Sequence, residues 1–180
     1  MNEMIELDLA DKRHRALKRL MLARRDIDAA RDAINYLIVR VKSEKHPLFD
    51  PLSCAAVIYY AKPFIHCREC PSLPRKYSVF PEEEMHSLHD AVIEHRNKVV
   101  AHSDEDVNLV SLIPKGSEVT WAGGKGKGIV SCHGDSFRFR YLALRVFPFF
   151  KKLCDFQLSR LRQHISLEKE ELFPIIGVKT

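Results

Sequence analysis

Residues 82–104 read EEEMHSLHDAVIEHRNKVVAHSD, and this stretch indicates more about the fold than any other part of the chain. Pro81 and the glutamates that follow it are typical of a helix start, because proline suits the first turn and carboxylates stabilise its positive end. The spacing predicts a helix that runs from there to about residue 101 or 102. Its apolar side chains recur at steps of three and four and form one stripe: Met85, Leu88, Val92, Ile93, Val99 and Val100.

Arg96 lies in the middle of that stripe, where a cation is costly unless it is paired or faces something polar. His102 follows about 120° further around the helix, so one straight helix would not direct both side chains at one atom. Either the helix ends near His102, or a second copy of the helix completes the pair. The structural alternative is that Arg96 pairs with a carboxylate while His102 caps the end of the helix.

The N-terminal half predicts further helices. Residues 3–45 have apolar positions at helical spacing and no Gly or Pro, so we expect one long helix, broken once at most. Between residues 11 and 45 Lys and Arg outnumber Asp and Glu, which indicates a solvated face or, alternatively, a nucleic-acid-binding face. A second helix is expected to start at Asp50-Pro51 and to end or kink at Pro63, before a loop over 66–80.

The C-terminal half begins with a different pattern. Short segments rich in β-branched residues over about 107–134 predict a small β-hairpin or three-stranded meander. Asp135-Ser136 is expected to cap a final long helix from Phe137 to about Leu167, kinked by Pro148, with a tail over 168–180. The predicted fold class is therefore mainly α: a helical bundle with a small β insert before its last helix.

The composition is that of a globular protein. The 180 residues are 46% hydrophobic and 29% charged, which favours a single domain over residues 1–180 and excludes a wholly disordered chain. The net charge of +5 permits a polyanionic partner without requiring one. Five cysteines, an odd number, favour a reducing compartment. Because residues 1–25 lack an apolar core and no apolar stretch reaches the length of a membrane span, we predict a cytoplasmic protein without membrane contact.

The segment RNKVVAH (96–102) resembles the signature of the HEPN superfamily, in which an arginine is separated from a histidine by four to six residues. The residue after the arginine is typically polar in that signature, as Asn97 is. The segments IYYAKPF (58–64) and LHDAVIEHRNKVVAHSD (88–104) are similar to the abortive-infection-type HEPN proteins of bacteria. The resemblance covers roughly residues 50–105 well, and the surrounding helices in outline.

The resemblance implies a helical bundle that forms a homodimer, with the motifs of both subunits facing each other. Many members are metal-independent endoribonucleases that act as toxins or antiviral effectors, so the expected function is RNA cleavage in bacterial defence or growth control. The alternative is a catalytically silent HEPN module that binds a nucleotide, an RNA or a partner protein. A third interpretation is a structural dimer whose interface Arg96 and His102 hold together.

The resemblance also implies roles for individual residues. His102 would move the proton of the RNA 2′-OH, Arg96 would brace the phosphate oxygens as charge builds, and Asn97 would position a phosphate or orient the histidine. His95, seven residues before His102 on the same flank, is taken as a binding residue. Asp104 stands where a toxin branch has a tyrosine that a partner nucleotidyltransferase modifies, so that form of antitoxin control is not expected.

The glycine-rich turn GGKGKG (123–128) is a second candidate for RNA binding. Lys125 and Lys127 can reach phosphates without reading base sequence, and Trp121 can stack on a base. The alternative is an ordinary solvated hairpin tip with Trp121 packed on the helices.

Cys67 and Cys70 form a lone CxxC. Zinc would need two further ligands, which His66 or the pair Cys132 and His133 would have to supply. Without a second CxxC we interpret the two cysteines as loop thiols, and we expect neither a metal nor a cofactor.

Overall fold

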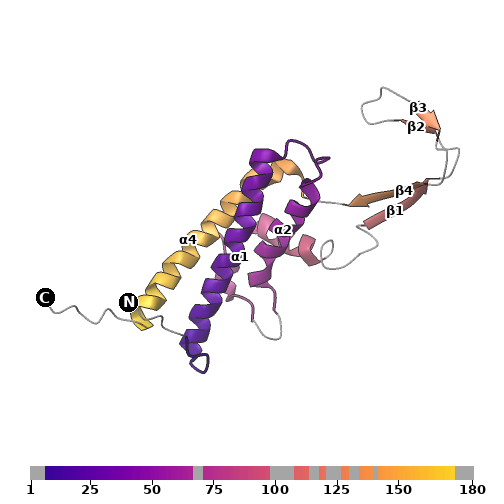
Figure 1. The fold of residues 1–180 in the computed structure, drawn as a ribbon. Coiled ribbons are helices and arrows are strands. Elements are labelled where there is room, and N and C mark those ends of the chain that lie inside the picture. Colours follow the sequence, from indigo (N-terminus) through magenta and orange to yellow (C-terminus); the bar gives the residue numbers. More distant parts are fainter. Residues whose placement is uncertain are drawn as a thin grey trace, which may run out of the picture. The chain divides into compact units, whose positions relative to one another are not determined.

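The computed structural model describes the helical part of the chain and the backbone of four short strands. The described residues are 7–66, 71–97, 108–113, 118–120, 127–129, 134–139 and 142–172. They divide into two compact units: Met1–Arg96 together with Leu142–Thr180, and Asn97–Tyr141. The described part is mainly helical, as predicted, and the first unit is a bundle of four α-helices (Figure 1).

Helix α1 spans Lys12–Arg40, so the prediction of one helix over 3–45 was wrong at both ends. The start is set by Asp11, whose side chain accepts hydrogen bonds from two backbone amides of the first turn at 2.6 and 3.1 Å. Such a cap satisfies amides that have no partner within the helix. The end is set by Val41, which has an extended backbone although no Gly or Pro is near.

Helix α2 spans Phe49–Ala61 and continues as a short 3₁₀ turn, η1, over Lys62–Phe64. The second predicted helix is confirmed, and Pro63 does mark the change of geometry at its end. Asp50 lies inside the first turn instead of capping it. In the predicted loop that follows, Arg75–Ser78 form the 3₁₀ turn η2.

Helix α3 spans Glu83–His95, and Arg96 and Asn97 follow in a wider π-type turn. Its predicted start is confirmed to within two residues. Its predicted end, at residue 101 or 102, lies outside the described residues.

Helix α4 spans Phe147–Leu172 and follows the 3₁₀ turn η4, Leu144–Val146. The prediction of a helix from Phe137 to Leu167 with a kink at Pro148 was therefore wrong at both ends, since the helix starts later and ends later. Pro148 is the second residue of α4, where its missing N–H has no intrahelical partner to lose. The Asp135-Ser136 pair, expected as the cap, belongs to a strand.

The second unit contains strands β1 (Asn108–Ile113), β2 (Glu118–Thr120), β3 (Lys127–Ile129) and β4 (Gly134–Phe139). β1 pairs with β4 and β2 pairs with β3, both antiparallel. The β2–β3 pair is nested in sequence between β1 and β4.

In the helical unit, α1 packs against both α2 and α4, and α4 runs antiparallel to α1 (Figure 1). At one end Arg13 of α1 pairs with Glu168 and Glu171 of α4. At the other end Glu44, just after α1, accepts a hydrogen bond from the Leu144 amide at 2.8 Å. These contacts fix the register of the two long helices.

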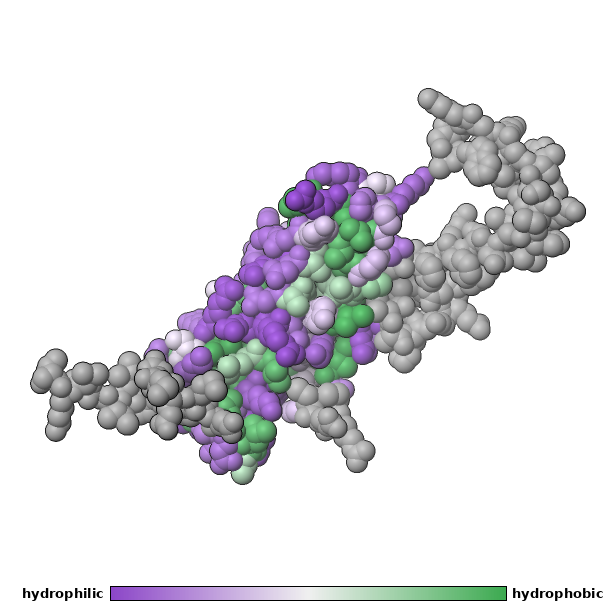
Figure 2. Space-filling model, viewed as in Figure 1, coloured by the Kyte–Doolittle hydropathy of each residue, from purple (hydrophilic) through white to green (hydrophobic). Residues whose placement is uncertain are grey.

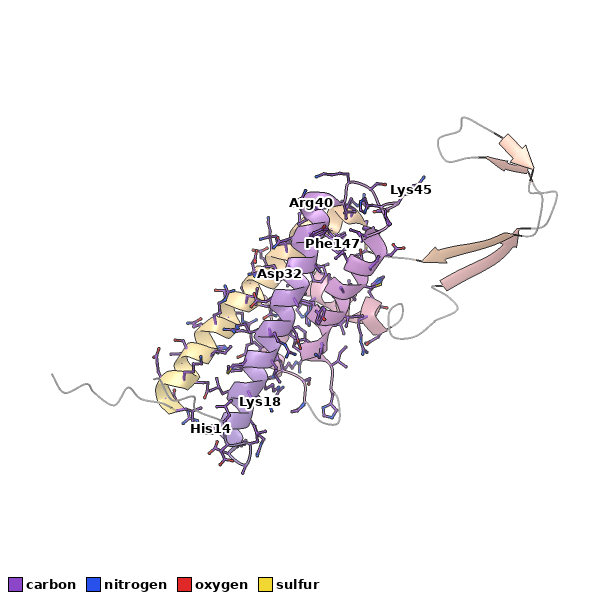
Figure 3. All side chains as sticks on the ribbon, viewed as in Figure 1. His14, Lys18, Asp32, Arg40, Lys45 and Phe147 are labelled. Atoms are coloured by element: carbon purple, nitrogen blue, oxygen red, sulfur yellow. The ribbon has the colours of Figure 1, made fainter. Side chains whose placement is uncertain are left out.

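The core lies between these helices. Figure 3 shows Phe147 at the end of the bundle where α1 reaches Arg40, and the Phe147 ring meets the Phe49 ring edge to face at 6.2 Å. The core contains, among other fully buried side chains, Leu17, Ile27, Ile34, Leu37, Tyr60, Phe150, Leu153, Leu158 and Leu161. None of the helices within the described ranges is long and apolar enough to cross a membrane.

The segment before α3 is held on α4 through its backbone. Gln157 Nε2 donates to the Tyr77 carbonyl at 2.6 Å, and the Arg160 guanidinium donates to the carbonyls of Lys76 and Val79. Arg160 also lies over the Tyr77 ring at 5.4 Å. A loop without a helical period is thereby fixed in position next to the end of α2.

Candidate functional site

Arg96 lines a cavity of about 440 Å³ in the helical unit. Residues of α1, α2, η1, the segment after η1 and the end of α3 surround it. The α1 positions 19, 22, 23 and 26 are spaced by three and four, so they share one face of the helix. The apolar part of the lining includes Leu22, Ala23, Ile58, Pro63, Ile65 and Leu73.

The charged part of the lining is strongly basic. The described lining has a net charge of +3, because Arg19, Arg25, Lys62 and Arg96 contribute four cationic groups and Asp26 contributes one carboxylate. Low-dielectric walls focus such a field and raise the local concentration of anions. The cavity is therefore suited to an anionic ligand.

Asp26 organises two of these cations. Its side chain is only 7% exposed, whereas those of Arg25 and Lys62 are 64% and 55% exposed. Asp26 Oδ1 accepts from Arg25 Nη2 at 2.9 Å and from Nε at 3.3 Å, and Oδ2 lies 3.3 Å from Lys62 Nζ. One buried carboxylate thus draws two long, otherwise solvent-exposed side chains to the cavity.

Arg96 reaches the cavity from the C-terminal end of α3. Its backbone N–H is shared between the carbonyls of Val92 and Ile93, and Arg96 and Asn97 form the π-type turn. Such turns interrupt α-helices rarely and are frequent at functional sites. The Arg96 side chain is half-buried and, as a lining residue, is not in the middle of the bundle core. The predicted apolar stripe is buried at Met85, Leu88 and Val92.

The segment after η1 closes another side of the cavity. The Leu73 amide donates to the Pro63 carbonyl at 2.7 Å, which joins residues ten apart in the chain. Leu73 is 6% exposed and presents an apolar wall. The residues between Ile65 and Pro71 include Cys67 and Cys70, which lie outside the described part of the chain.

The other predicted site residues are distributed as follows. His95 is the last residue of α3 and is half-buried, and burial lowers its pKa. Asn97 is exposed in the turn after Arg96. Lys127 opens β3, where its backbone pairs with Thr120. His102, Trp121 and Lys125 lie outside the described residues, so the distance between Arg96 and His102 stays open.

A second polar site lies in the core between α2 and α3. Tyr60 Oη is 3.0 Å from His89 Nδ1, and both residues are buried. The rings of Phe64 and Phe80 lie 4.6 and 5.0 Å from the imidazole, and that of Phe150 lies 5.2 Å from the Tyr60 ring. Desolvation lowers the pKa of His89 to about 4, so the ring is neutral at pH 7 and its Nδ1 can accept a hydrogen bond from the Tyr60 hydroxyl.

Sequence reasoning did not find either the Asp26 centre or the Tyr60–His89 pair. Asp26 gives a signal in retrospect, because it stands among Ala23, Ile27 and Ala30 on the buried face of α1. A carboxylate at such a position needs partners, and this one has them. His89 gives a weaker signal, since many helices contain histidine on one flank.

Within the described ranges, no group of three or more His, Cys, Asp or Glu side chains is placed to hold a metal ion. The described cysteines, Cys54 and Cys154, are free thiols. Burial raises the pKa of the Cys154 thiol far above its ordinary value, which removes its reactivity as a thiolate.

The arrangement as a whole is a basic cavity with one buried carboxylate, beside a sealed neutral Tyr–His pair. A comparison with protein-family models, with curated proteins and with solved structures finds no significant match to this chain.

Proposed function

We propose that this chain is a metal-independent endoribonuclease of HEPN type, in which Arg96 stabilises the phosphate that is cleaved. The observation that carries the proposal is the position of Arg96 in a cavity whose described lining has a net charge of +3. A guanidinium can bind two phosphate oxygens at once and gains strength as their charge grows in the transition state.

The remaining chemistry rests on His102 and Asn97. A histidine titrates near neutral pH, so His102 can take the proton of the 2′-OH as it attacks the adjacent phosphate, and can return a proton to the leaving oxygen. Asn97, exposed beside Arg96, is assigned to bind a phosphate oxygen or to orient the imidazole. His95, also beside Arg96, is assigned to RNA binding.

We further propose that the active form is a homodimer built on α2. This helix has one charged residue, Asp50, and is apolar on its outer as well as its inner side, which is typical of a helix that is covered on both sides. Ile58 and Tyr59 are 42% and 41% exposed. Figure 2 shows hydrophobic surface gathered over α2, while hydrophilic residues cover much of α1 and α4. Because Ile58 also lines the cavity, a partner on this face would adjoin Arg96.

The dimer is tested by light scattering at micromolar concentration. We expect twice the chain mass for the wild type and the chain mass for Tyr59→Glu, since a charge in a covered apolar face is costly. Ser43→Glu is the control, because it adds the same single negative charge at an exposed position in the loop after α1. A monomeric wild type would contradict the proposed dimer and, with it, a site built from both subunits.

The cleavage is tested with total RNA in EDTA. We expect cleavage by the wild type and a loss of about 100-fold or more for His102→Ala, with the fold intact by circular dichroism. The double variant Cys67→Ser with Cys70→Ser should cleave as the wild type does. Loss of activity in the cysteine variant, together with loss of bound zinc, would assign the site to the CxxC instead.

The alternative function is a silent HEPN module that binds a nucleotide, an RNA or a protein partner. The cavity itself favours this alternative, because its basic lining supports anion binding whether or not His102 lies near. RNA that binds in the same assay without being cut would establish it. In either case we assign no antitoxin, and the cytoplasmic location stays a prediction.

The contact of the β insert with RNA also stays a prediction. If Lys125 and Lys127 reach phosphates and Trp121 stacks on a base, the double variant Lys125→Ala with Lys127→Ala should weaken binding to all RNA sequences alike. The slope of log affinity against log salt should then fall by at most about two units. An unchanged slope would leave the turn as a solvated hairpin tip.

A further inference from the structure

Most of the charge in the cavity comes from outside the Arg-His motif. Arg19 and Arg25 belong to α1 and Lys62 belongs to η1, and only Arg96 belongs to the motif. Arg25 and Lys62 are held by the buried Asp26 at distances of 2.9 and 3.3 Å. Arg25 and Lys62 therefore share one buried carboxylate as their partner, although both side chains are more than half exposed.

The amount of charge favours a dianion. A phosphodiester of RNA carries one negative charge, whereas a terminal phosphate monoester carries about −1.5 to −2 at pH 7. The net charge of +3 on the described lining matches the terminal phosphate monoester more closely. Two anchored cations and a further guanidinium can together bind the oxygens of one terminal phosphate.

The size and the apolar walls require more than a phosphate. The cavity volume of about 440 Å³ falls within the roughly 300–1,000 Å³ of pockets that hold whole small molecules. Leu22, Ile58 and Leu73 supply an apolar surface that a bare ion would leave uncovered. Guanidinium groups also stack on aromatic faces, so a lining that combines apolar side chains with arginines favours a ligand with a flat aromatic group.

We propose that this cavity binds a small aromatic phosphate monoester, with Arg25, Lys62 and Arg96 on the phosphate and the apolar walls on the aromatic group. Asp26 is a positioning residue that holds two of the three cations. The inference shares Arg96 with the proposed function but requires no cleavage. The aromatic group can be a nucleobase or another aryl group, and the shared chemistry is the aromatic phosphate.

The binding is measured by isothermal titration of the full chain with four probes: adenosine 5′-monophosphate, phenyl phosphate, inorganic phosphate and adenosine. We expect at least one of the two aromatic phosphates to bind about tenfold or more tightly than either phosphate or adenosine alone. Tighter binding of adenosine 5′-monophosphate identifies a nucleotide, and tighter binding of phenyl phosphate identifies another aryl phosphate. Equal binding of inorganic phosphate would overturn the proposal, because it would indicate only a diffuse positive surface.

Single-charge variants test the assigned contacts. Arg25→Gln and Lys62→Gln should each weaken binding by about tenfold, the effect of one charge-assisted hydrogen bond. Arg40→Gln is the matched control, because it removes the same charge from α1 far from the cavity; Figure 3 shows Arg40 near the opposite end of α1 from Lys18. An equal loss in the control would overturn the proposal.

Asp26→Asn separates positioning from net charge. It makes the cavity more positive by one unit, so a diffuse field would bind the aromatic phosphate more tightly. If Asp26 positions Arg25 and Lys62, the variant binds more weakly despite its higher charge, and Arg25→Lys retains part of the affinity in the presence of Asp26. Tighter binding by Asp26→Asn would overturn the positioning role, provided that its thermal unfolding matches the wild type.

The result is distinct from that of the RNA assay. Binding of an aromatic phosphate without RNA cleavage would support this inference and contradict the ribonuclease. Cleavage of RNA without such binding would support the ribonuclease and contradict this inference. Binding of an RNA oligonucleotide when neither aromatic phosphate binds would also contradict this inference.

Discussion

Two polar sites lie close together along the same elements, and they differ in almost every physical property. Tyr60 and His89 are enclosed by aromatic rings, and each is the other's partner at 3.0 Å. Lys62 and Arg96, two and seven residues further along the chain, line an open cavity of about 440 Å³. The first site is neutral and sealed, and the second is charged and accessible.

The difference in charge and solvent access indicates a structural role for the Tyr60–His89 pair and a binding role for the cavity. In a sealed site the low dielectric penalises charge, so the lowered pKa of His89 keeps the ring neutral, and its Nδ1 accepts the hydrogen bond of the Tyr60 hydroxyl. Such a pair contributes to a unique packing of α2 against α3. In the cavity the same elements keep their cations in contact with solvent, where charge is tolerated and can attract an anion. We therefore expect substitutions in the pair to change stability, and substitutions in the cavity to change binding.

The largest expected effect is on catalysis. Arg96→Ala should lower the rate of RNA cleavage by about 100-fold or more, because the charge that develops on the phosphate loses its bidentate partner. The midpoint of thermal unfolding should stay within a few degrees of the wild type. Arg96→Lys is the control that keeps the charge, and it should recover only part of the rate. A large drop in stability instead would place Arg96 with the sealed, structural groups.

The next largest effect is the pH dependence of stability. His89 has a pKa of about 4 in the folded protein, below the value of about 6.5 in an unfolded chain, so between these values the unfolded state binds more protons. The free energy of unfolding should therefore fall as the pH falls from about 6.5 to 4, by at most about 3 kcal/mol. Urea denaturation at several pH values measures this. His89→Gln should flatten the dependence over that window, and an equally steep slope in the variant would assign the titration to other groups.

A smaller effect is expected for the hydroxyl of the pair. Tyr60→Phe keeps the ring packing but leaves His89 Nδ1 buried without a partner, which should cost about 1–3 kcal/mol of unfolding free energy. Tyr36→Phe removes the same hydroxyl from a tyrosine of α1 that is 49% exposed and should change stability by less than about 0.5 kcal/mol. Equal effects in the two variants would mean that the hydrogen bond at Tyr60 contributes little.

The smallest effect on stability is expected at the cavity. Arg25→Gln breaks an ion pair whose cation is 64% exposed, and exposed pairs contribute about 0–1 kcal/mol. Urea denaturation should show a change at the low end of that range, while binding of an anion changes strongly. A loss as large as that of Tyr60→Phe would remove the distinction between the two sites.

The sequence predicted the parts of the fold that repeat locally. The helical character, the second helix up to Pro63 and the start of α3 follow from spacing, proline and carboxylates within one or two turns. The start of α4 was missed, because Asp135-Ser136 has the composition of a cap although it lies in β4, opposite β1. Pairing with Leu112 and Ser111, which are 23 and 25 residues away in the chain, is a non-local effect that overrides a local cap signal.

The candidate site was predicted only at Arg96 and its neighbours. The cavity depends on α1, on the stretch from α2 to Leu73 and on the end of α3, which meet in space. No periodicity within one of them indicates that Asp26 of α1 will lie near Lys62 of η1. A charged residue on the buried face of a helix shows that a partner is needed without showing which one it is. The same holds for His89, whose partner Tyr60 is 29 residues away.

The hydrogen bond from the Leu73 amide to the Pro63 carbonyl makes one backbone proton a reporter of the cavity wall. This amide can exchange its hydrogen with solvent only when the wall lifts away from η1. Arg160 and Gln157 hold the following residues on α4, so the lifting is a local opening and not a fraying of the whole loop. A ligand that fills the cavity should slow exchange at Leu73 while the amides in the middle of α1 keep their rates, and mass spectrometry can follow that single peptide without any knowledge of the ligand.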